Sequence, residues 1–308
     1  MSVKTTPPAI YVGPEPWPEL IEVASEFGTI ADNPVDGNVI LWFGRDPQQI
    51  VGKWSDKLQW LQLPDAGIEK WLVPEIVEGN FSTTSASGAY GGQVAEHALS
   101  LILAGYHELV RASRALQWDP SSLKVSTLRE AQVLIVGAGG IGTGLSELLE
   151  AFSCNTTFAT KFPRQVGSGS ISIGFADIKQ ELSRFDVVVL ACPSTDETRW
   201  MVDSRFLQSM NSDSMLINVA RGDLVVTRDL IHALETHQIR FAGLDVTSPE
   251  PLPADSKLFK LSNCLITPHV ANPPEQKKQG FVHLARLNLE NFTSGKPLRG
   301  TISTSRGY

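Results

Sequence analysis

The segment Val133-Leu-Ile-Val-Gly-Ala-Gly-Gly-Ile-Gly142 constrains the fold more than any other part of the chain. Four apolar residues typical of a buried strand lead into a glycine-rich turn, and a helical pattern follows. The spacing is G-x-G-x-x-G, in which the glycines permit a tight turn, close approach of a pyrophosphate and close helix packing. The sequence therefore predicts a dinucleotide cradle at a helix N-terminus. The candidate contacts are Gly137, Gly139, Gly140, Ile141 and Gly142.

The rest of the chain repeats the alternation of strand and helix. Further apolar runs are expected to form strands at residues 156–159, 186–191, 215–219, 241–246 and 264–267, with helices at 140–152, 178–184 and 228–236. Runs this continuous are typical of parallel strands covered on both faces. The first ninety-odd residues show the same alternation, with strands at 9–12, 39–42 and 58–63 and a helix at 18–27. An α/β fold with two units is predicted.

Bulk composition excludes several classes of protein. The 308 residues suffice for two domains, and a net charge of -7 argues against a nucleic-acid or acidic-membrane surface. The N-terminus lacks the apolar core of a signal peptide and no apolar run approaches a membrane span, so a cytoplasmic location is expected. The three cysteines are widely spaced, which favours buried thiols of a reducing compartment over disulfides, and no metal site is expected.

The end of the second predicted strand bears on the choice of cofactor. An acidic residue that binds the adenosine ribose of NAD is usual there, but this chain has Thr160, followed by Lys161 and Arg164. A missing acid and two cations suit a 2'-phosphate, so NADP is favoured and NAD remains possible. The alternative is that the two basic residues are simply solvated on a loop.

Three polar residues at the ends of predicted strands describe a reactive site. Arg221 can hold a carboxylate through two parallel hydrogen bonds, and His269, supported by Glu250, can exchange a proton near neutral pH. Each residue alone is as often structural as catalytic, but together with a dinucleotide cradle they predict a site for a 2-oxo or 2-hydroxy acid. The other histidines are not accompanied by such an arginine and carboxylate. His97 lies in a predicted connector helix that starts near Val94 and runs to about residue 110.

Several motifs together carry a resemblance to a known family. They are Val94-Ala-Glu-His97, the glycine motif, Pro193-Ser-Thr-Asp-Glu-Thr198, Asn218-Val-Ala-Arg-Gly-Asp223, Leu244-Asp-Val246 with Glu250-Pro-Leu-Pro253, and Thr267-Pro-His269. In this order they resemble the D-isomer-specific 2-hydroxyacid dehydrogenase family. The family fold implies two Rossmann-like domains with doubly wound parallel sheets. The discontinuous substrate domain would comprise residues 1–93 and 275–308 and the dinucleotide-binding domain residues 94–274, with the long helix from Val94 contributing to a homodimer.

The resemblance also implies residue roles. Arg221 would bind and polarise the substrate, His269 would be the general acid, and Glu250 would hold the imidazole and stabilise its protonated form. Asp245 would accept a hydrogen bond from the nicotinamide carboxamide. Further cofactor contacts are expected at Pro193, Thr198 and Ala220.

The loop at residues 63–69 resembles the family's substrate loop, and its sequence is most like that of the glyoxylate and hydroxypyruvate reductase branch. Backbone amides around Ala66 and Gly67 would bind the substrate carboxylate. Trp42 would wall the pocket, although a core aromatic is an equal alternative.

The expected activity is therefore NADPH-preferring reduction of a small 2-oxo acid, with glyoxylate or hydroxypyruvate as first candidates. The carboxylate of Glu250 disfavours the formate-oxidising branch, which has an amide there. Two alternatives remain: a short phosphoglycerate dehydrogenase-like enzyme, and a dinucleotide-sensing, corepressor-like binding protein.

Overall fold

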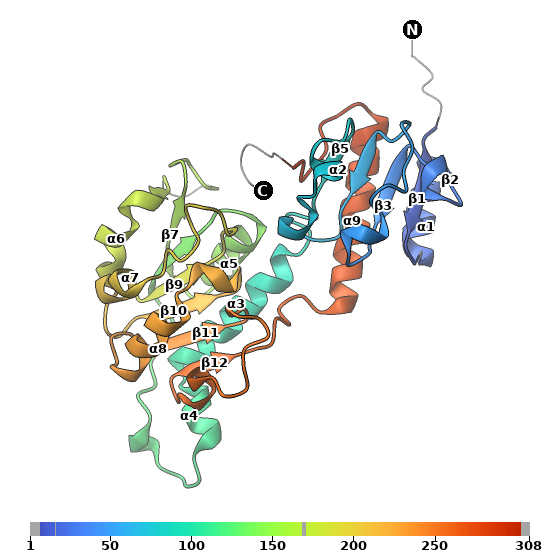
Figure 1. The fold of residues 1–308 in the computed structure, drawn as a ribbon. Helices are drawn as coiled ribbons and strands as arrows, with labels where there is room; N and C mark the ends of the chain where they lie inside the picture. The colour runs from blue at the N-terminus through green and yellow to red at the C-terminus, as the bar shows by residue number, and fades with distance from the viewer. Residues whose placement is uncertain (1–6, 16, 168–170, 303–308) are drawn as a thin grey trace. The chain divides into compact units, whose positions relative to one another are not determined.

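The computed structural model describes residues 7–15, 17–167 and 171–302. The chain divides into two compact units, one formed by Met1–Tyr90 with Pro274–Tyr308 and the other by Gly91–Pro273. Each unit is built around a parallel β-sheet with helices packed on it (Figure 1). The predicted α/β class with two parallel sheets is confirmed.

The sheet of the second unit has seven parallel strands in the order β12-β11-β10-β9-β6-β7-β8. The chain runs outward from β6 to β7 and β8, then returns to the other side of β6 and continues outward from β9. A doubly wound sheet binds ligands at such a reversal, beyond the carboxyl ends of the strands. The strands are β6 (Gln132–Val136), β7 (Asn155–Thr160), β8 (Ile173–Gly174), β9 (Val187–Leu190), β10 (Met215–Asn218), β11 (Phe241–Leu244) and β12 (Cys264–Ile266).

Helices cover both faces of this sheet, which explains the unbroken apolar runs of its strands (Figure 1). Val133 and Ile135 of β6 pack in the cluster that contains α3 and α5, whereas Leu134 and Val136 pack in the cluster that contains α6, α7 and α8. Successive side chains point to opposite faces, so both faces are apolar. The helices are α3 (Gly91–Tyr106), α4 (Leu109–Arg114), α5 (Gly140–Glu150), α6 (Ile178–Glu181), α7 (Ser204–Ser209) and α8 (Thr227–Glu235).

The sheet of the first unit has five parallel strands in the order β2-β1-β3-β4-β5. Ile10 and Val12 of β1 pack with Phe281 and Leu289 of α9, which is how the last helix joins the N-terminal residues. A second cluster on β3 and β4 includes Trp71. The elements are β1 (Ala9–Gly13), α1 (Pro18–Ser25), β2 (Thr29–Ile30), β3 (Val39–Trp42), β4 (Trp60–Gln62), α2 (Pro74–Val77), β5 (Ser82–Thr84) and α9 (Pro274–Thr293).

Some elements differ from the sequence-based expectation. The long helix predicted to run to about residue 110 ends at Tyr106, and α4 begins anew at Leu109. Glu108 between them has a left-handed backbone (φ 49°), which interrupts the helical hydrogen bonding. The strands β2, β5 and β8 and the helix α7 were not predicted. These strands have only two or three residues, and β5 reads Ser-Thr-Thr without an apolar run.

The described cysteines lie in or near the core. All three are free; Cys192 and Cys264 are buried and Cys154 is half-buried. Burial raises the pKa of Cys192 and of Cys264 to about 12. Among the described residues, no helix is both long and apolar enough to cross a membrane, and no cluster of histidine, cysteine and acidic side chains is arranged to hold a metal ion.

Candidate active site

The polar residues singled out in the second unit gather at one edge of its sheet. Because all seven strands are parallel, their carboxyl ends share that edge. The glycine turn follows β6, Arg221 follows β10, Asp245 follows β11 and His269 follows β12. The topology therefore brings together residues that are far apart in the sequence.

The glycine turn has the geometry that a pyrophosphate requires. Gly137 has φ +113°, and a Cβ there would lie 2.5 Å from the carbonyl oxygen of Ala191. A Cβ on Gly142 would collide with the carbonyl of Gly137, whereas Gly139 has open space around it. Gly139 precedes the first residue of α5, and no side chain caps that helix end. The exposed N-terminus of α5 fits a phosphate group bound by backbone amides.

The loop after β7 is held by two hydroxyl groups. Thr160 is buried, and its Oγ1 donates to the carbonyl oxygen of Phe162 at 2.9 Å. The Oγ1 of Thr160 also lies 2.5 Å from Oγ of Ser172, which in turn accepts from the backbone N–H of Arg164 at 2.9 Å. Since the hydroxyl proton of Thr160 is donated to Phe162, Ser172 donates to Thr160. Thr160 thus shapes the loop that carries the two cations.

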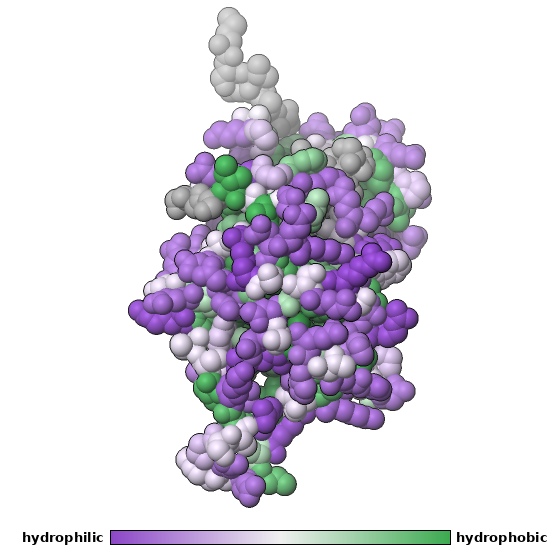
Figure 2. All heavy atoms as spheres, turned by 90° about the vertical axis from the view of Figure 1, so that its left-hand side faces the viewer, coloured by the Kyte–Doolittle hydropathy of each residue, from purple (hydrophilic) through white to green (hydrophobic). Residues whose placement is uncertain are grey.

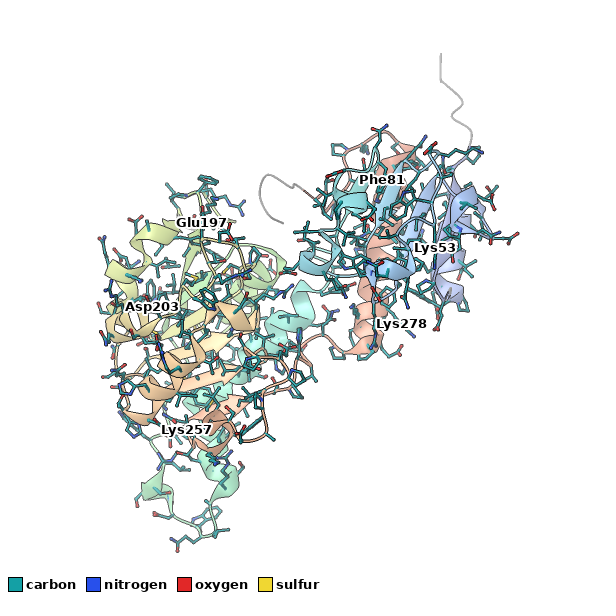
Figure 3. The ribbon with its side chains drawn as sticks, viewed as in Figure 1. Lys53, Phe81, Glu197, Asp203, Lys257 and Lys278 are labelled. Atoms are coloured by element: carbon teal, nitrogen blue, oxygen red, sulfur yellow. The ribbon has the colours of Figure 1, made fainter. Side chains whose placement is uncertain are left out.

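The two cations of this loop have different partners. The Nη2 of Arg164 donates to the carbonyl oxygen of Ala138 at 3.2 Å, so its guanidinium lies beside the glycine turn. The Nζ of Lys161 lies 2.7 Å from Oε1 of Glu197, and both side chains are about half exposed (Glu197 is labelled in Figure 3). Glu197 was not predicted as a site residue. The sequence around it gives no sign of an ion pair with Lys161, which follows β7.

The segment from Pro193 to Thr198 forms a tight turn after β9. Thr198 is buried, and its Oγ1 donates to the carbonyl oxygen of Pro193 at 2.7 Å and accepts from the N–H of Thr195 at 2.8 Å. Pro193 itself is exposed. Ser194 donates to Oδ2 of Asp223 at 2.8 Å, which ties this turn to the one that carries Arg221.

The turn at Arg221 is fixed from two sides. Asn218 donates from Nδ2 to the carbonyl oxygen of Arg221 at 2.8 Å and accepts from the N–H of the buried Ala220 at 3.1 Å. A side chain at Gly222 would collide with the carbonyl of Thr247, so glycine lets the turn pack directly against the segment that follows β11. The Arg221 side chain is half-buried, and its Nη1 donates to the carbonyl oxygen of Ala220 at 2.7 Å.

His269 and Glu250 form a close pair. The Nδ1 of His269 lies 2.6 Å from Oε1 of Glu250, and the two side chains are 54% and 43% exposed. The backbone of His269 is left-handed (φ 54°), and its N–H donates to the carbonyl oxygen of Asp245 at 2.9 Å. Pairing at Nδ1 fixes the ring so that Nε2 is the nitrogen available to a substrate.

Asp245 is a buried acceptor of several hydrogen bonds and is 2% exposed. Its Oδ1 accepts from Oγ1 of Thr267 at 2.6 Å and from the N–H of Val270 at 3.0 Å, and its Oδ2 accepts from the N–H of Ala271 at 3.1 Å. The Nε2 of His97 lies 2.8 Å from Oγ1 of Thr267 and 3.3 Å from Oδ1 of Asp245. Sequence reasoning missed this partner of Asp245, because His97 lies in a helix with no local sign of such a contact.

The candidate substrate residues of the first unit lie in and near the loop after β4. Ala66 is exposed and Gly67 half-buried. The neighbouring Asp65 accepts from Nε1 of Trp71 and from Nζ of Lys277, each at 2.9 Å, and pairs with Lys70 at 2.9 Å. Burial acts to raise the pKa of Asp65, but the two lysines and the indole hold it below its ordinary value. This anchoring fixes one end of the loop.

Trp42 lies at the end of β3 and is 3% exposed. It packs in the apolar cluster that contains Ile40 and Trp71, as expected of a core aromatic. Its buried indole N–H has no hydrogen-bond acceptor among the described residues.

The amino-acid sequence is similar to a known family and to one of its members. Residues 97–271, more than half of the chain, match the family model described as D-isomer specific 2-hydroxyacid dehydrogenase, NAD binding domain. The chain is 30% identical over 258 residues to the human glyoxylate reductase/hydroxypyruvate reductase, covering 82% of this chain and 79% of the human protein.

Solved structures share the fold. A D-isomer specific 2-hydroxyacid dehydrogenase from Xanthobacter autotrophicus Py2 superimposes with a TM-score of 0.83 at 21% identity, covering 98% of this chain and 100% of that chain. An NADPH-dependent glyoxylate/hydroxypyruvate reductase from Sinorhizobium meliloti gives a TM-score of 0.80 at 20% identity, covering 97% of this chain and 99% of the other.

Proposed function

The chain belongs to the D-isomer specific 2-hydroxyacid dehydrogenase family, and from that premise we propose that it reduces a small 2-oxo acid to the D-2-hydroxy acid with a nicotinamide cofactor. The observation that carries the proposal is the 2.6 Å pair of His269 and Glu250 at the same sheet edge as the open glycine turn. The relatives' names, glyoxylate reductase and hydroxypyruvate reductase, favour this activity over a phosphoglycerate dehydrogenase-like or corepressor-like function.

The chemistry assigns a role to each residue of the site. When bound, the reduced nicotinamide supplies a hydride to the carbonyl carbon of the substrate. The carbonyl oxygen then becomes an alkoxide and needs a proton, which Nε2 of His269 donates. Glu250 stabilises the protonated imidazole through Nδ1 and holds the ring in place. Arg221 binds the substrate carboxylate and polarises the carbonyl.

The cofactor would lie along the carboxyl edge of the seven-stranded sheet. The pyrophosphate would bind the amides at the N-terminus of α5, around Gly139 and Ile141. Asp245 would orient the carboxamide, and the turn that begins at Pro193 and is shaped by Thr198 would support the nicotinamide side. On this assignment the second unit, residues 91–273, is the dinucleotide-binding domain and the first unit the substrate domain.

The phosphorylated cofactor is the proposed preference. Thr160 stands where an acid would repel a 2'-phosphate, and its hydroxyl holds the loop that presents Lys161 and Arg164. The Xanthobacter and Sinorhizobium structures contain NADPH and NADP respectively, which supports this preference.

Glyoxylate and hydroxypyruvate are the proposed substrates, in line with the name of the human relative. The amides of Ala66 and Gly67 in the first unit would also bind the substrate carboxylate. Of the two roles expected for Trp42, the core aromatic is the one we assign, because its side chain is 3% exposed and packs with Ile40 and Trp71.

A homodimer is proposed from the segment between α4 and β6. Leu116 and Trp118 there are 101% and 96% exposed. In Figure 2 this segment lies at the bottom, where hydrophobic residues reach the surface. A second copy that covers them would remove this apolar surface from water. The free thiols further support the proposal that the protein works in the cytoplasm.

The direct test is a mixture of the purified protein with NADPH and glyoxylate, in which the nicotinamide absorbance should fall. A panel of 2-oxo acids with both NADPH and NADH then separates substrate from cofactor preference. If no 2-oxo acid consumes either cofactor, the proposed activity is wrong. Size-exclusion chromatography with light scattering tests the homodimer, which a monomeric mass would contradict.

A further inference from the structure

We propose that His97 is a positioning residue: it donates a hydrogen bond that fixes Thr267 and the buried carboxylate of Asp245, and so sets the nicotinamide end of the site. The inference rests on the proposed function in one respect, namely that Asp245 contacts the carboxamide. Its structural basis is the contact of Nε2 of His97 with Oγ1 of Thr267 at 2.8 Å.

The direction of the hydrogen bonds follows from the number of protons. Thr267 has a single hydroxyl proton, and it is donated to Oδ1 of Asp245 at 2.6 Å. The oxygen of Thr267 can therefore only accept from the imidazole of His97. Nε2 of His97 must carry a proton, and the same nitrogen lies 3.3 Å from Oδ1 of Asp245.

This network holds the main chain at the proton donor and at the two residues that follow it. The carboxylate of Asp245 accepts from the N–H groups of Val270 and Ala271, and its backbone carbonyl accepts from the N–H of His269. A carboxylate that accepts several hydrogen bonds keeps one orientation only while its donors remain. Loss of the donor at His97 leaves this orientation less restrained on the side of α3.

His97 is well placed for this role because its own backbone is fixed. It lies in α3, where Val94, Ala98 and Leu101 are buried in the core cluster on the sheet. Its side chain is 20% exposed. A site residue supported by a partner on a packed helix is held more precisely than one supported from a loop.

The effect should be confined to one end of the cofactor. The adenosine end would bind near Lys161 and Arg164, beyond β7, whereas the network of His97 lies beyond β11 and β12. Removal of His97 should therefore weaken binding of a complete dinucleotide and spare binding of its adenosine end alone. A general structural defect would weaken both.

The experiment compares His97→Ala and His97→Gln with the unchanged protein by isothermal titration calorimetry. The ligands are NADPH and NADH, and separately adenosine 2',5'-bisphosphate and ADP. We expect His97→Ala to raise the Kd of the preferred dinucleotide by up to about tenfold, the upper end of the scale of one hydrogen bond, and to leave the Kd of its adenosine fragment within about twofold. The amide of His97→Gln retains an N–H donor and should restore most of the affinity. His107→Ala, at an exposed position directly after α3, is the matched control.

The outcomes separate this inference from the proposed function. Three results would each overturn the role of His97. They are an unchanged dinucleotide Kd in His97→Ala, an equal rise of the Kd for dinucleotide and fragment, and a dinucleotide Kd in His97→Gln that is no lower than in His97→Ala. An unchanged protein that binds the dinucleotide but reduces no 2-oxo acid refutes the proposed activity alone. A protein that binds neither dinucleotide overturns both. In the unliganded protein, nitrogen-15 NMR should find a proton on Nε2 of His97, and a bare Nε2 would contradict the network.

Discussion

Replacement of Glu250 by glutamine isolates the contribution of charge to proton donation. The side chain keeps its size and can still accept from Nδ1 of His269, now 2.6 Å from the carboxylate, but the negative charge is lost. Two unit charges about 4 Å apart attract by about 1 kcal/mol in water and about 4 kcal/mol at an effective dielectric constant of 20. The two side chains are 54% and 43% exposed, so the interaction energy lies near the value for water. We therefore expect the substitution to cost about 1–1.5 kcal/mol of attraction between the carboxylate and the protonated imidazole.

The direction of the effect follows from the role of the imidazole. The proton donor is positively charged while it holds its proton, and the carboxylate of Glu250 stabilises that charge. Without the carboxylate, kcat/KM for reduction should fall by up to about tenfold, because about 1.4 kcal/mol corresponds to a factor of ten in rate.

The assay is kcat/KM for glyoxylate at neutral pH, followed by nicotinamide absorbance. Glu235→Gln is a matched control, since Glu235 is also exposed and paired, at 3.0 Å from Lys257. A kcat/KM that is unchanged or higher in Glu250→Gln would refute the reasoning and remove Glu250 from proton donation.

Three further predictions concern the substrate, the cofactor and the loop after β4. Arg221→Lys should raise the KM for the 2-oxo acid at least about tenfold, because lysine cannot form the paired hydrogen bonds; an unchanged KM would argue against carboxylate binding there. Glu197→Gln should release Lys161 and lower the KM for NADPH by up to about fivefold, the scale of an exposed ion pair, without changing the KM for NADH, while the exposed neighbour variant Asp196→Asn should do neither. Asp65→Asn should lower the free energy of unfolding at pH 7 by roughly 1–3 kcal/mol in urea titrations. The pKa of Asp65 is lowered in the folded state, so its contribution to stability is present above the ordinary value of 3.8 and is lost as the pH falls through the lower folded-state value. The difference in unfolding free energy between Asp65→Asn and the unchanged protein should therefore shrink as the pH falls below 3.8, and a constant difference would contradict the prediction.

The parts of the molecule that the sequence predicted are those with local signals. The turn after β6 is encoded by glycines at fixed spacing, and the strand cores by apolar runs, so both were placed within a few residues. The gathering of Arg221 and His269 at one edge followed from parallel strands, whose carboxyl ends must coincide. These inferences needed only the type and order of the elements.

The contacts that the sequence did not predict join residues from different elements. His97 reaches Thr267 from a helix 170 positions away, and Lys161 reaches Glu197 from the far side of β6. Thr160 was interpreted only as a missing acid, whereas its hydroxyl organises the cation-bearing loop through Ser172. Such pairs depend on how loops pack, which leaves no periodic pattern in the sequence.

Consumption of NADPH by the purified protein in the presence of a 2-oxo acid tests the central claim most directly. The account predicts loss of nicotinamide absorbance with glyoxylate or hydroxypyruvate, matched by formation of the 2-hydroxy acid, and a rate that collapses in His269→Ala. No consumption with any member of a broad 2-oxo acid panel, with either NADPH or NADH, would contradict it.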